Sequence, residues 1–114
     1  MAAGYTELFL EQGTTFQSQI TLDGTSGEAY DLTGYIAKSH IKKSYYSTSP
    51  TAEFTVIILQ PATTGIISLG LTSNQTANIA PGRYVYDAVI IDSGNTVTRI
   101  LEGIIDVAPS VTIV

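Results

Sequence analysis

Short runs of strand-forming residues, separated by turn residues about every ten positions, limit this chain to few folds. We expect strands over residues 15–22, 35–42, 54–59, 66–71, 82–92, 96–107 and 111–114. Residues 54–59 are almost continuously apolar, which predicts a strand buried on both faces. A helical turn is expected over residues 73–80, with Ser73 as its N-cap and Pro81-Gly82 as its stop. The pattern predicts an all-β sandwich of seven to eight strands with one short helical turn.

Both ends of the chain are apolar, at residues 5–10 and 111–114. Each could pair inside the domain as an outer strand, or add to the sheet edge of a neighbouring molecule. Sequence leaves both alternatives open, because it does not place an edge.

Length and composition limit the class of protein. A chain of 114 residues fits a single domain spanning 1–114, and it has no cysteine for disulfides, thiolate metal sites or thiol catalysis. Charged residues make up 13% of the chain, about half of the ~25% typical of soluble domains. The net charge of -5 opposes binding to nucleic acid or to anionic membranes. So few charges indicate that neighbouring proteins cover part of the surface.

No pattern of reactive residues predicts an enzyme. The single histidine, His40, stands between Lys38 and Lys42 on the polar face of a strand, with no nucleophile and carboxylate arranged around it. The carboxylates are spread along strands and turns and do not form a metal-binding loop. Asp87 is expected to pair with Arg99 or Lys38 across strands. We therefore predict no catalytic residue, no cofactor, no metal and no small-molecule substrate.

Basic and aromatic side chains gather in residues 38–46. Single-strand nucleic-acid binders have this mixture, but the net negative charge opposes that function. The segment is instead interpreted as a solvated face or as a docking patch for an acidic protein. The candidate docking residues are Lys38, Lys42, Lys43, Tyr45 and Tyr46.

The stretch GRYVYDAVIID, residues 82–92, follows the expected helical turn. In immunoglobulin-like sandwiches a tyrosine at the start of strand F bonds back to the E–F corner, two residues before a core position. In this stretch the chain resembles an immunoglobulin-like sandwich, and the resemblance implies that the helical turn lies at that corner. Tyr84 is the predicted corner tyrosine, and Tyr86, Phe16 and Phe54 are predicted core residues. Ala88 and Ile90 are expected on the inward face of the strand together with Tyr86.

The opposite face of the same strand carries Arg83, Val85, Asp87, Val89 and Ile91. It is too apolar to lie bare in water along its length. We expect a second sheet or a neighbouring subunit to cover it.

Four motifs carry a resemblance: EQGTTF (11–16), YDLTGY (30–35), GRYVYDAVI (82–90) and VTRILEGIIDVAPSVT (97–112). With them the chain resembles small immunoglobulin-like structural proteins of tailed bacteriophages of the T4-like cyanophage type. It is more distantly similar to the N-terminal immunoglobulin-like domain of baseplate upper proteins. The resemblance implies a non-enzymatic accessory module of the tail, at the neck or baseplate. Such a module binds other virion proteins in several symmetric copies.

The resemblance places the protein in the virion. The start of the chain lacks the basic region and apolar stretch of a secretion signal, so we expect assembly in the host cytoplasm. One alternative is a capsid decoration protein seated on the major capsid lattice, which copy number would distinguish from a tail protein. A further alternative is a host-surface or carbohydrate-binding module that uses Tyr45 and Tyr46.

Overall fold

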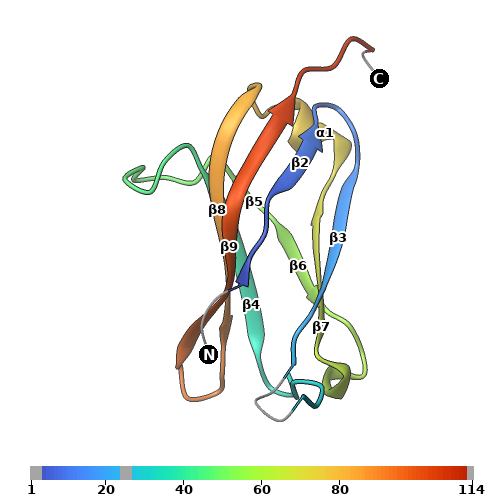
Figure 1. Ribbon diagram of the computed structural model, residues 1–114, viewed down its shortest axis with the longest axis vertical. Coiled ribbons are helices and arrows are strands. Elements are labelled where there is room, and N and C mark those ends of the chain that lie inside the picture. The colour runs from blue at the N-terminus through green and yellow to red at the C-terminus, as the bar shows by residue number, and fades with distance from the viewer. Residues whose placement is uncertain (1–3, 24–26, 113–114) are drawn as a thin grey trace.

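Two β-sheets pack face to face in the computed structural model, which describes residues 4–23 and 27–112 (Figure 1). The larger sheet contains β1 (Gly4–Tyr5), β2 (Leu8–Glu11), β4 (Ile36–Lys42), β5 (Ala52–Glu53), β8 (Gly82–Ile91) and β9 (Val97–Ala108). The smaller sheet contains β3 (Phe16–Thr21), β6 (Thr55–Ile58) and β7 (Ile66–Leu71). The spatial order is β1-β9-β8-β4-β5 in the larger sheet, with β2 also paired to β9, and β3-β7-β6 in the smaller. The predicted β-sandwich of two packed sheets is therefore confirmed, although the described residues form nine strands and not the expected seven to eight.

The core lies between the sheets and follows the period of two along β8. Tyr84, Tyr86, Ala88 and Ile90 are all buried, while the residues between them are more exposed. Across the sandwich, the central strand β7 contributes the buried side chains of Ile67, Leu69 and Leu71. The predicted inward row of residues 86, 88 and 90 is confirmed.

The expectation that residues 54–59 are buried on both faces is wrong. Phe54 is buried, but β6 alternates in exposure and Ile57 is 53% exposed. β6 is an edge strand of the smaller sheet, and the outer face of that sheet meets solvent. Isoleucine at position 57 is therefore explained by its preference for strands and not by packing against a second layer.

One α-helix is present in the described part of the chain, α1 (Ser73–Ala77), and a 3₁₀ turn, η1 (Ala62–Thr64), lies between β6 and β7. The helix starts at Ser73, but its N-cap is Thr72 and not the predicted Ser73, and it ends at Ala77, short of the predicted residue 80. The Thr72 side chain accepts from the Gln75 N–H at 3.2 Å, and the Gln75 side chain accepts from the Thr72 N–H at 2.8 Å. This reciprocal capping box satisfies two amide groups that Ser73 could not reach together. No helix that the structure describes is long and apolar enough to cross a bilayer.

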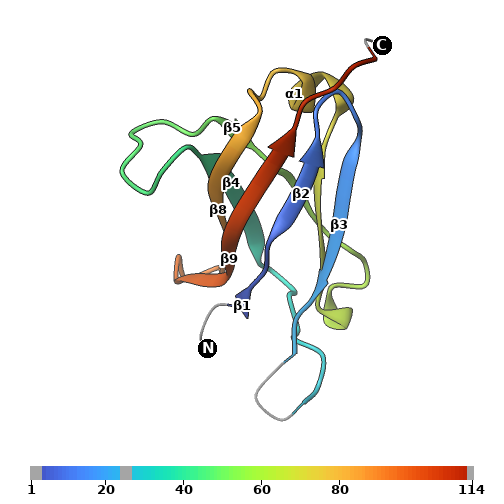
Figure 2. The ribbon, with the colours of Figure 1, turned by 45° about the horizontal axis from the view of Figure 1, so that its top comes forward.

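The N-terminal segment forms strands, whereas the described C-terminal residues do not (Figure 2). Near the N-terminus, β1 and β2 pair in parallel with β9 inside the domain. The strand expected over residues 111–114 is not formed at Val111 and Thr112, which follow Pro109 as irregular chain, and residues 113–114 lie outside the described residues. Proline lacks the N–H that a continued ladder requires.

Candidate protein-binding face

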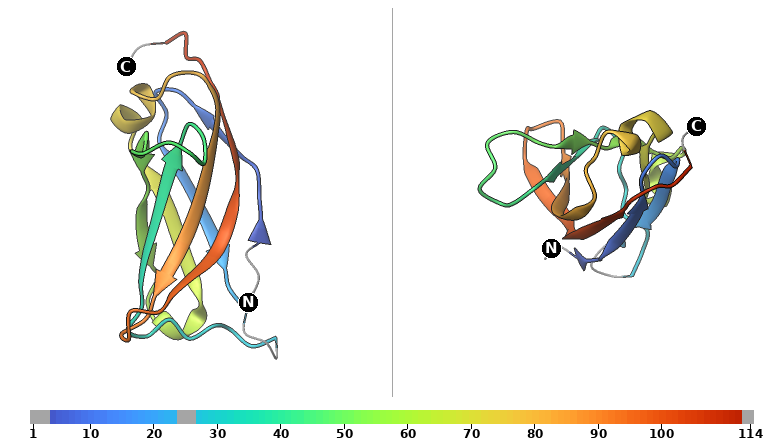
Figure 3. Two further views of the ribbon diagram at one scale, coloured as in Figure 1. Left: turned by 90° about the vertical axis from the view of Figure 1, so that its left-hand side faces the viewer. Right: turned by 90° about the horizontal axis from the view of Figure 1, so that it is seen from above.

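The outer face of the larger sheet is the side turned away from the smaller sheet (Figure 3). Strand pairing arranges its side chains in rows that cross β4, β8 and β9. One row joins Lys42, Val85 and Ile104, and the next joins His40 and Asp87 with Glu102. Since the smaller sheet covers only the inner face, the expected cover of Val85, Val89 and Ile91 by a second sheet is wrong. These side chains are half-buried by their own neighbours in the sheet.

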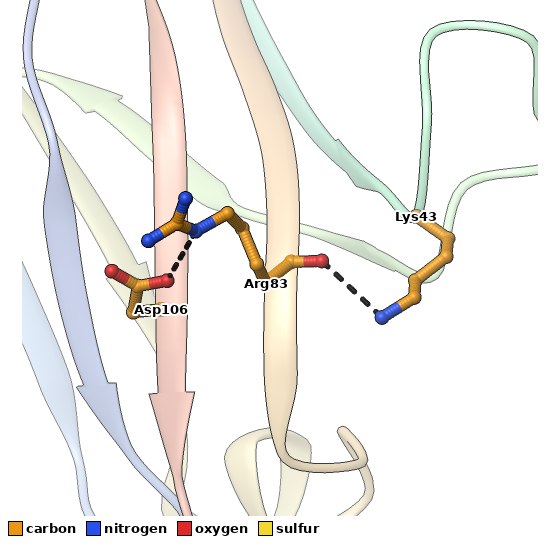
Figure 4. Close-up of polar contacts among 3 residues, drawn as sticks. All are labelled: Lys43, Arg83 and Asp106. Carbon is orange, nitrogen blue, oxygen red and sulfur yellow. Dashed lines mark hydrogen bonds and ion pairs between the residues drawn. The ribbon is translucent and has the colours of Figure 1, made fainter.

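Ion pairs neutralise the carboxylates on β8 and β9. Arg99 lies 3.3 Å from Asp87 and 3.5 Å from Glu102, measured from guanidinium nitrogen to carboxylate oxygen. Of the two partners expected for Asp87, Arg99 or Lys38, Arg99 is the one that pairs with it. Arg83 donates to Asp106 at 2.9 Å, and this hydrogen bond raises the pKa of the Arg83 guanidinium above its ordinary value (Figure 4). The acidic groups of these two strands are thus already paired.

The three lysines of the predicted docking patch do not point the same way. Lys38 and Lys42 lie on the outer face and make no ion pair within the described residues. Lys43 turns to the other side of the sheet, where its ammonium lies 4.7 Å from the centre of the Tyr84 ring. It also donates to the carbonyl oxygen of Arg83 at 3.3 Å (Figure 4). In the described part of the chain, Lys38 and Lys42 therefore remain unpaired on the outer face, and Lys43 packs beside the corner residue Tyr84.

The loop after β4, residues 43–51, projects beyond the body of the sandwich (Figures 1 and 3). Tyr45 is 67% exposed and Tyr46 is 94% exposed. Tyr45 borders a hollow of about 220 Å³ on the outer face, lined also by His40, Lys42 and Val85. Ligand pockets usually enclose about 300–1,000 Å³, so this hollow suits a protruding side chain of a partner better than a small molecule.

Large apolar side chains surround the outer face at its rim. Tyr5, Phe9, Ile36 and Val97 are each more than half exposed. Tyr5 lies beside Glu102 and Phe9 beside Asp106 through the parallel pairing with β9. The sequence alone does not place Tyr5 and Phe9 on this face, because only the parallel register shows which side they occupy. The order of polar and apolar residues from Tyr5 to Phe9 does not show which of them face the outer side.

The predicted corner and core residues lie between the two sheets, with Tyr84 and Tyr86 on β8, Phe16 on β3, and Phe54 between β5 and β6. The Tyr84 hydroxyl donates to the carbonyl oxygen of Ala80 at 2.7 Å. The Tyr86 hydroxyl donates to the carbonyl oxygen of Thr6 at 2.7 Å, and burial raises its pKa to about 12. Phe54 contacts both neighbouring rings, with centroids 6.2 Å from Tyr86 and 5.8 Å from Phe16.

Within residues 4–23 and 27–112, no group of three or more His, Asp or Glu side chains is arranged to hold a metal ion. His40 faces Glu53 at 3.7 Å on the exposed rim of the sheet. No protein-family model and no curated protein matches this sequence.

Proposed function

We propose that this protein is a non-enzymatic structural component of a tailed-phage virion, an immunoglobulin-like accessory module of the tail at the neck or baseplate. It is present in several symmetric copies and binds neighbouring virion proteins through the outer face of the larger sheet. One observation carries the proposal: this face is uncovered, yet four large apolar side chains on it are more than half exposed. An uncovered sheet face with several exposed large apolar side chains at its rim supports a protein interaction site.

The immunoglobulin-like topology is supported by the strand order. In constant-type immunoglobulin domains strands B, E and D share one sheet and C, F and G the other. Assigning β3, β7 and β6 to B, E and D, and β4, β8 and β9 to C, F and G, gives the same partition in chain order. Tyr84 at the start of β8 then occupies the corner position, with its hydroxyl bonded to the backbone four residues upstream.

Charge indicates an acidic partner. Arginine already pairs with the carboxylates of β8 and β9, whereas Lys38 and Lys42 on β4 have no acidic partner in the described chain. A neighbour that brings carboxylates to β4 and apolar groups to Ile36 would satisfy both features of the face. Electrostatic complementarity of this kind sets register and partner choice more than affinity.

The proposal is tested first in particles. We expect mass spectrometry of purified particles of the phage that carries this gene to detect the protein at a constant copy number per particle. A low number that matches the symmetry of the tail supports the neck or baseplate, and a number that matches the capsid lattice indicates capsid decoration. Absence from purified particles would contradict the proposal.

The role of the outer face is tested by complementing a phage that lacks the gene. We expect the double variant Lys38→Glu and Lys42→Glu, or the variant Ile36→Asp, to reduce incorporation into particles about tenfold or more. Thr55→Glu is the matched control, because Thr55 is exposed on the outer side of the smaller sheet. Normal incorporation of both outer-face variants would exclude this face as the docking surface.

A further inference from the structure

The two sheets have four edges, and three of them carry features that oppose pairing with another chain. The edge formed by β1 and β2 is interrupted after Tyr5 and carries Glu11. The opposite edge is formed by the two-residue β5, which carries Glu53, and by the part of β4 that β5 does not reach, which carries Lys38. β6 is only four residues long. It begins directly after Phe54, where the chain leaves the larger sheet, and the Phe54 N–H still donates to the carbonyl oxygen of Ser39 on β4 at 2.9 Å. Short or charged edges are the usual protection against edge-to-edge association.

The fourth edge, β3, has none of these features. Its six residues, FQSQIT, include no charge and no proline, and the strand pairs with β7 without a bulge. β3 forms one border of the molecule, with no other described ribbon beyond it in its sheet (Figures 1 and 2). A strand of this kind is a template for a further strand.

The hydrogen-bond register shows which backbone groups are free on β3. The Leu22 N–H donates to the Gly65 carbonyl oxygen at 2.8 Å, so Leu22 belongs to a hydrogen-bonded pair with β7. Such pairs alternate along an antiparallel ladder. The N–H and C=O groups of Gln17, Gln19 and Thr21 therefore point away from β7, and within the described residues no backbone group outside the strand ladder bonds to them.

We propose that β3 pairs antiparallel with β3 of a second copy of this chain, about a two-fold axis at Gln19. The two Gln19 residues then form a hydrogen-bonded pair with each other, and Gln17 of each copy pairs with Thr21 of the other. The free backbone groups of the edge all find partners in this register. The two three-stranded sheets join into one continuous six-stranded sheet.

The side chains favour a second copy as the occupant. On the outer side of the sheet the new neighbours are glutamine beside glutamine and glutamine beside threonine, which hydrogen-bond across strands. Asp23, the nearest acidic residue after β3, falls opposite Thr15 of the second copy, so no like charges face each other in this register. The outer-facing residues of the smaller sheet that continue this surface are also uncharged: Thr55, Ile57, Ser68 and Gly70. An isologous contact of this type closes as a dimer.

This inference goes beyond the proposed function, because it concerns contact between copies and not binding to another virion protein. It uses β3, and the proposed docking uses the outer face of the larger sheet. A purified protein that dimerises through β3 supports the inference whether or not the protein occurs in particles.

The test uses charge at the two-fold axis and sedimentation equilibrium of the purified full chain over a concentration series. Gln19→Lys places two like charges directly opposite each other, and so does Gln19→Glu. We expect each variant alone to dimerise about tenfold or more weakly than the wild type, because like charges this close repel. We expect an equimolar mixture of the two variants to recover dimerisation, since opposite charges then meet.

Thr55→Lys is the matched control: it adds the same charge to the same sheet on its other edge strand, and we expect it to dimerise like the wild type. Circular dichroism and the unfolding midpoint check that every variant is folded. A wild-type protein that stays monomeric throughout the series would overturn the inference. So would a dimer insensitive to both Gln19 variants, or a mixture that fails to recover association.

Discussion

Tyr84 and Tyr86 lie two residues apart on β8, and their hydroxyl groups secure two different parts of the chain. Tyr84 bonds to Ala80 and fixes the entry from the helix into the strand. Tyr86 crosses the sheet to Thr6, between β1 and β2, and so ties the N-terminal segment to the core. Both side chains are buried, so each hydroxyl needs its partner.

We expect Tyr84→Phe to lower the free energy of unfolding by about 1–2 kcal/mol, because the Ala80 carbonyl loses its donor in a partly buried site. Urea unfolding measures the change. Tyr46→Phe serves as the control, since Tyr46 is 94% exposed, and we expect a change within about 0.5 kcal/mol. Equal effects of the two variants would show that the corner bond contributes nothing.

Tyr86 makes stability depend on pH in the alkaline range. Its pKa is raised from the ordinary 10.0 to about 12 by burial, so the folded protein favours the neutral phenol. This contribution is fully present below about pH 10 and is lost as pH rises toward 12. We expect the stability difference between wild type and Tyr86→Phe to narrow over this range in thermal unfolding. A constant difference from pH 8 to pH 12 would contradict this assignment.

At the scale of elements, two local contacts matter: one starts helix α1 before β8, and the other holds the N-terminal segment against β9. The capping box at Thr72 starts α1. Gly103 on β9 lets the backbone of Thr6 approach closely, because a Cβ at Gly103 would collide with the Thr6 carbonyl. The Thr6 N–H also donates to the backbone carbonyl oxygen of Glu102 at 3.0 Å. These contacts keep the N-terminal strands inside the domain.

We expect Thr72→Ala to cost about 1 kcal/mol of stability and Ser73→Ala to be close to neutral. The reason is that only the Thr72 hydroxyl accepts from the Gln75 N–H. Chemical unfolding of the two variants side by side decides between the two residues as N-cap. A larger loss for Ser73→Ala would contradict the capping box.

Gly103→Ala is expected to release β1 from β9 and to speed amide hydrogen exchange at Tyr5 and Thr6. Gly70→Ala is the matched control in the smaller sheet, since a Cβ there meets only ordinary contacts at 3.6 and 3.9 Å. Exchange at β1 that is unchanged by Gly103→Ala would show that the close approach is not required.

At the scale of the whole molecule, charge is distributed unevenly. All five cationic residues of the chain lie on β4, β8 or β9 or directly after β4: Lys38, Lys42, Lys43, Arg83 and Arg99. The smaller sheet and its β3 edge carry no charged residue in their strands. The two proposed interfaces therefore differ in their electrostatics.

We expect added salt to act on the two interfaces in opposite directions. Pairing through β3 brings together two copies that each carry a net charge of -5, so screening their repulsion should strengthen the dimer. Docking of an acidic partner on Lys38 and Lys42 should weaken as salt screens that attraction. Sedimentation at low and high salt measures the first effect, and virion-partner binding measures the second. A dimer that dissociates on adding salt would point to a contact between charged faces.

Sequence by itself determined the all-β class, the inward row of β8, the turn positions and the residues that could pair, since these depend on local alternation and turn chemistry. It failed for residues 54–59, because an apolar run does not reveal whether its strand is central or at an edge. It also failed for Val111 and Thr112, because Pro109 just before them lacks the N–H that a continued ladder requires.

Only the tertiary structure decided which side Tyr5 and Phe9 occupy, which lysines are free and which edge of the smaller sheet is open. Each of these depends on register and strand order, which are set by contacts between residues far apart in the chain.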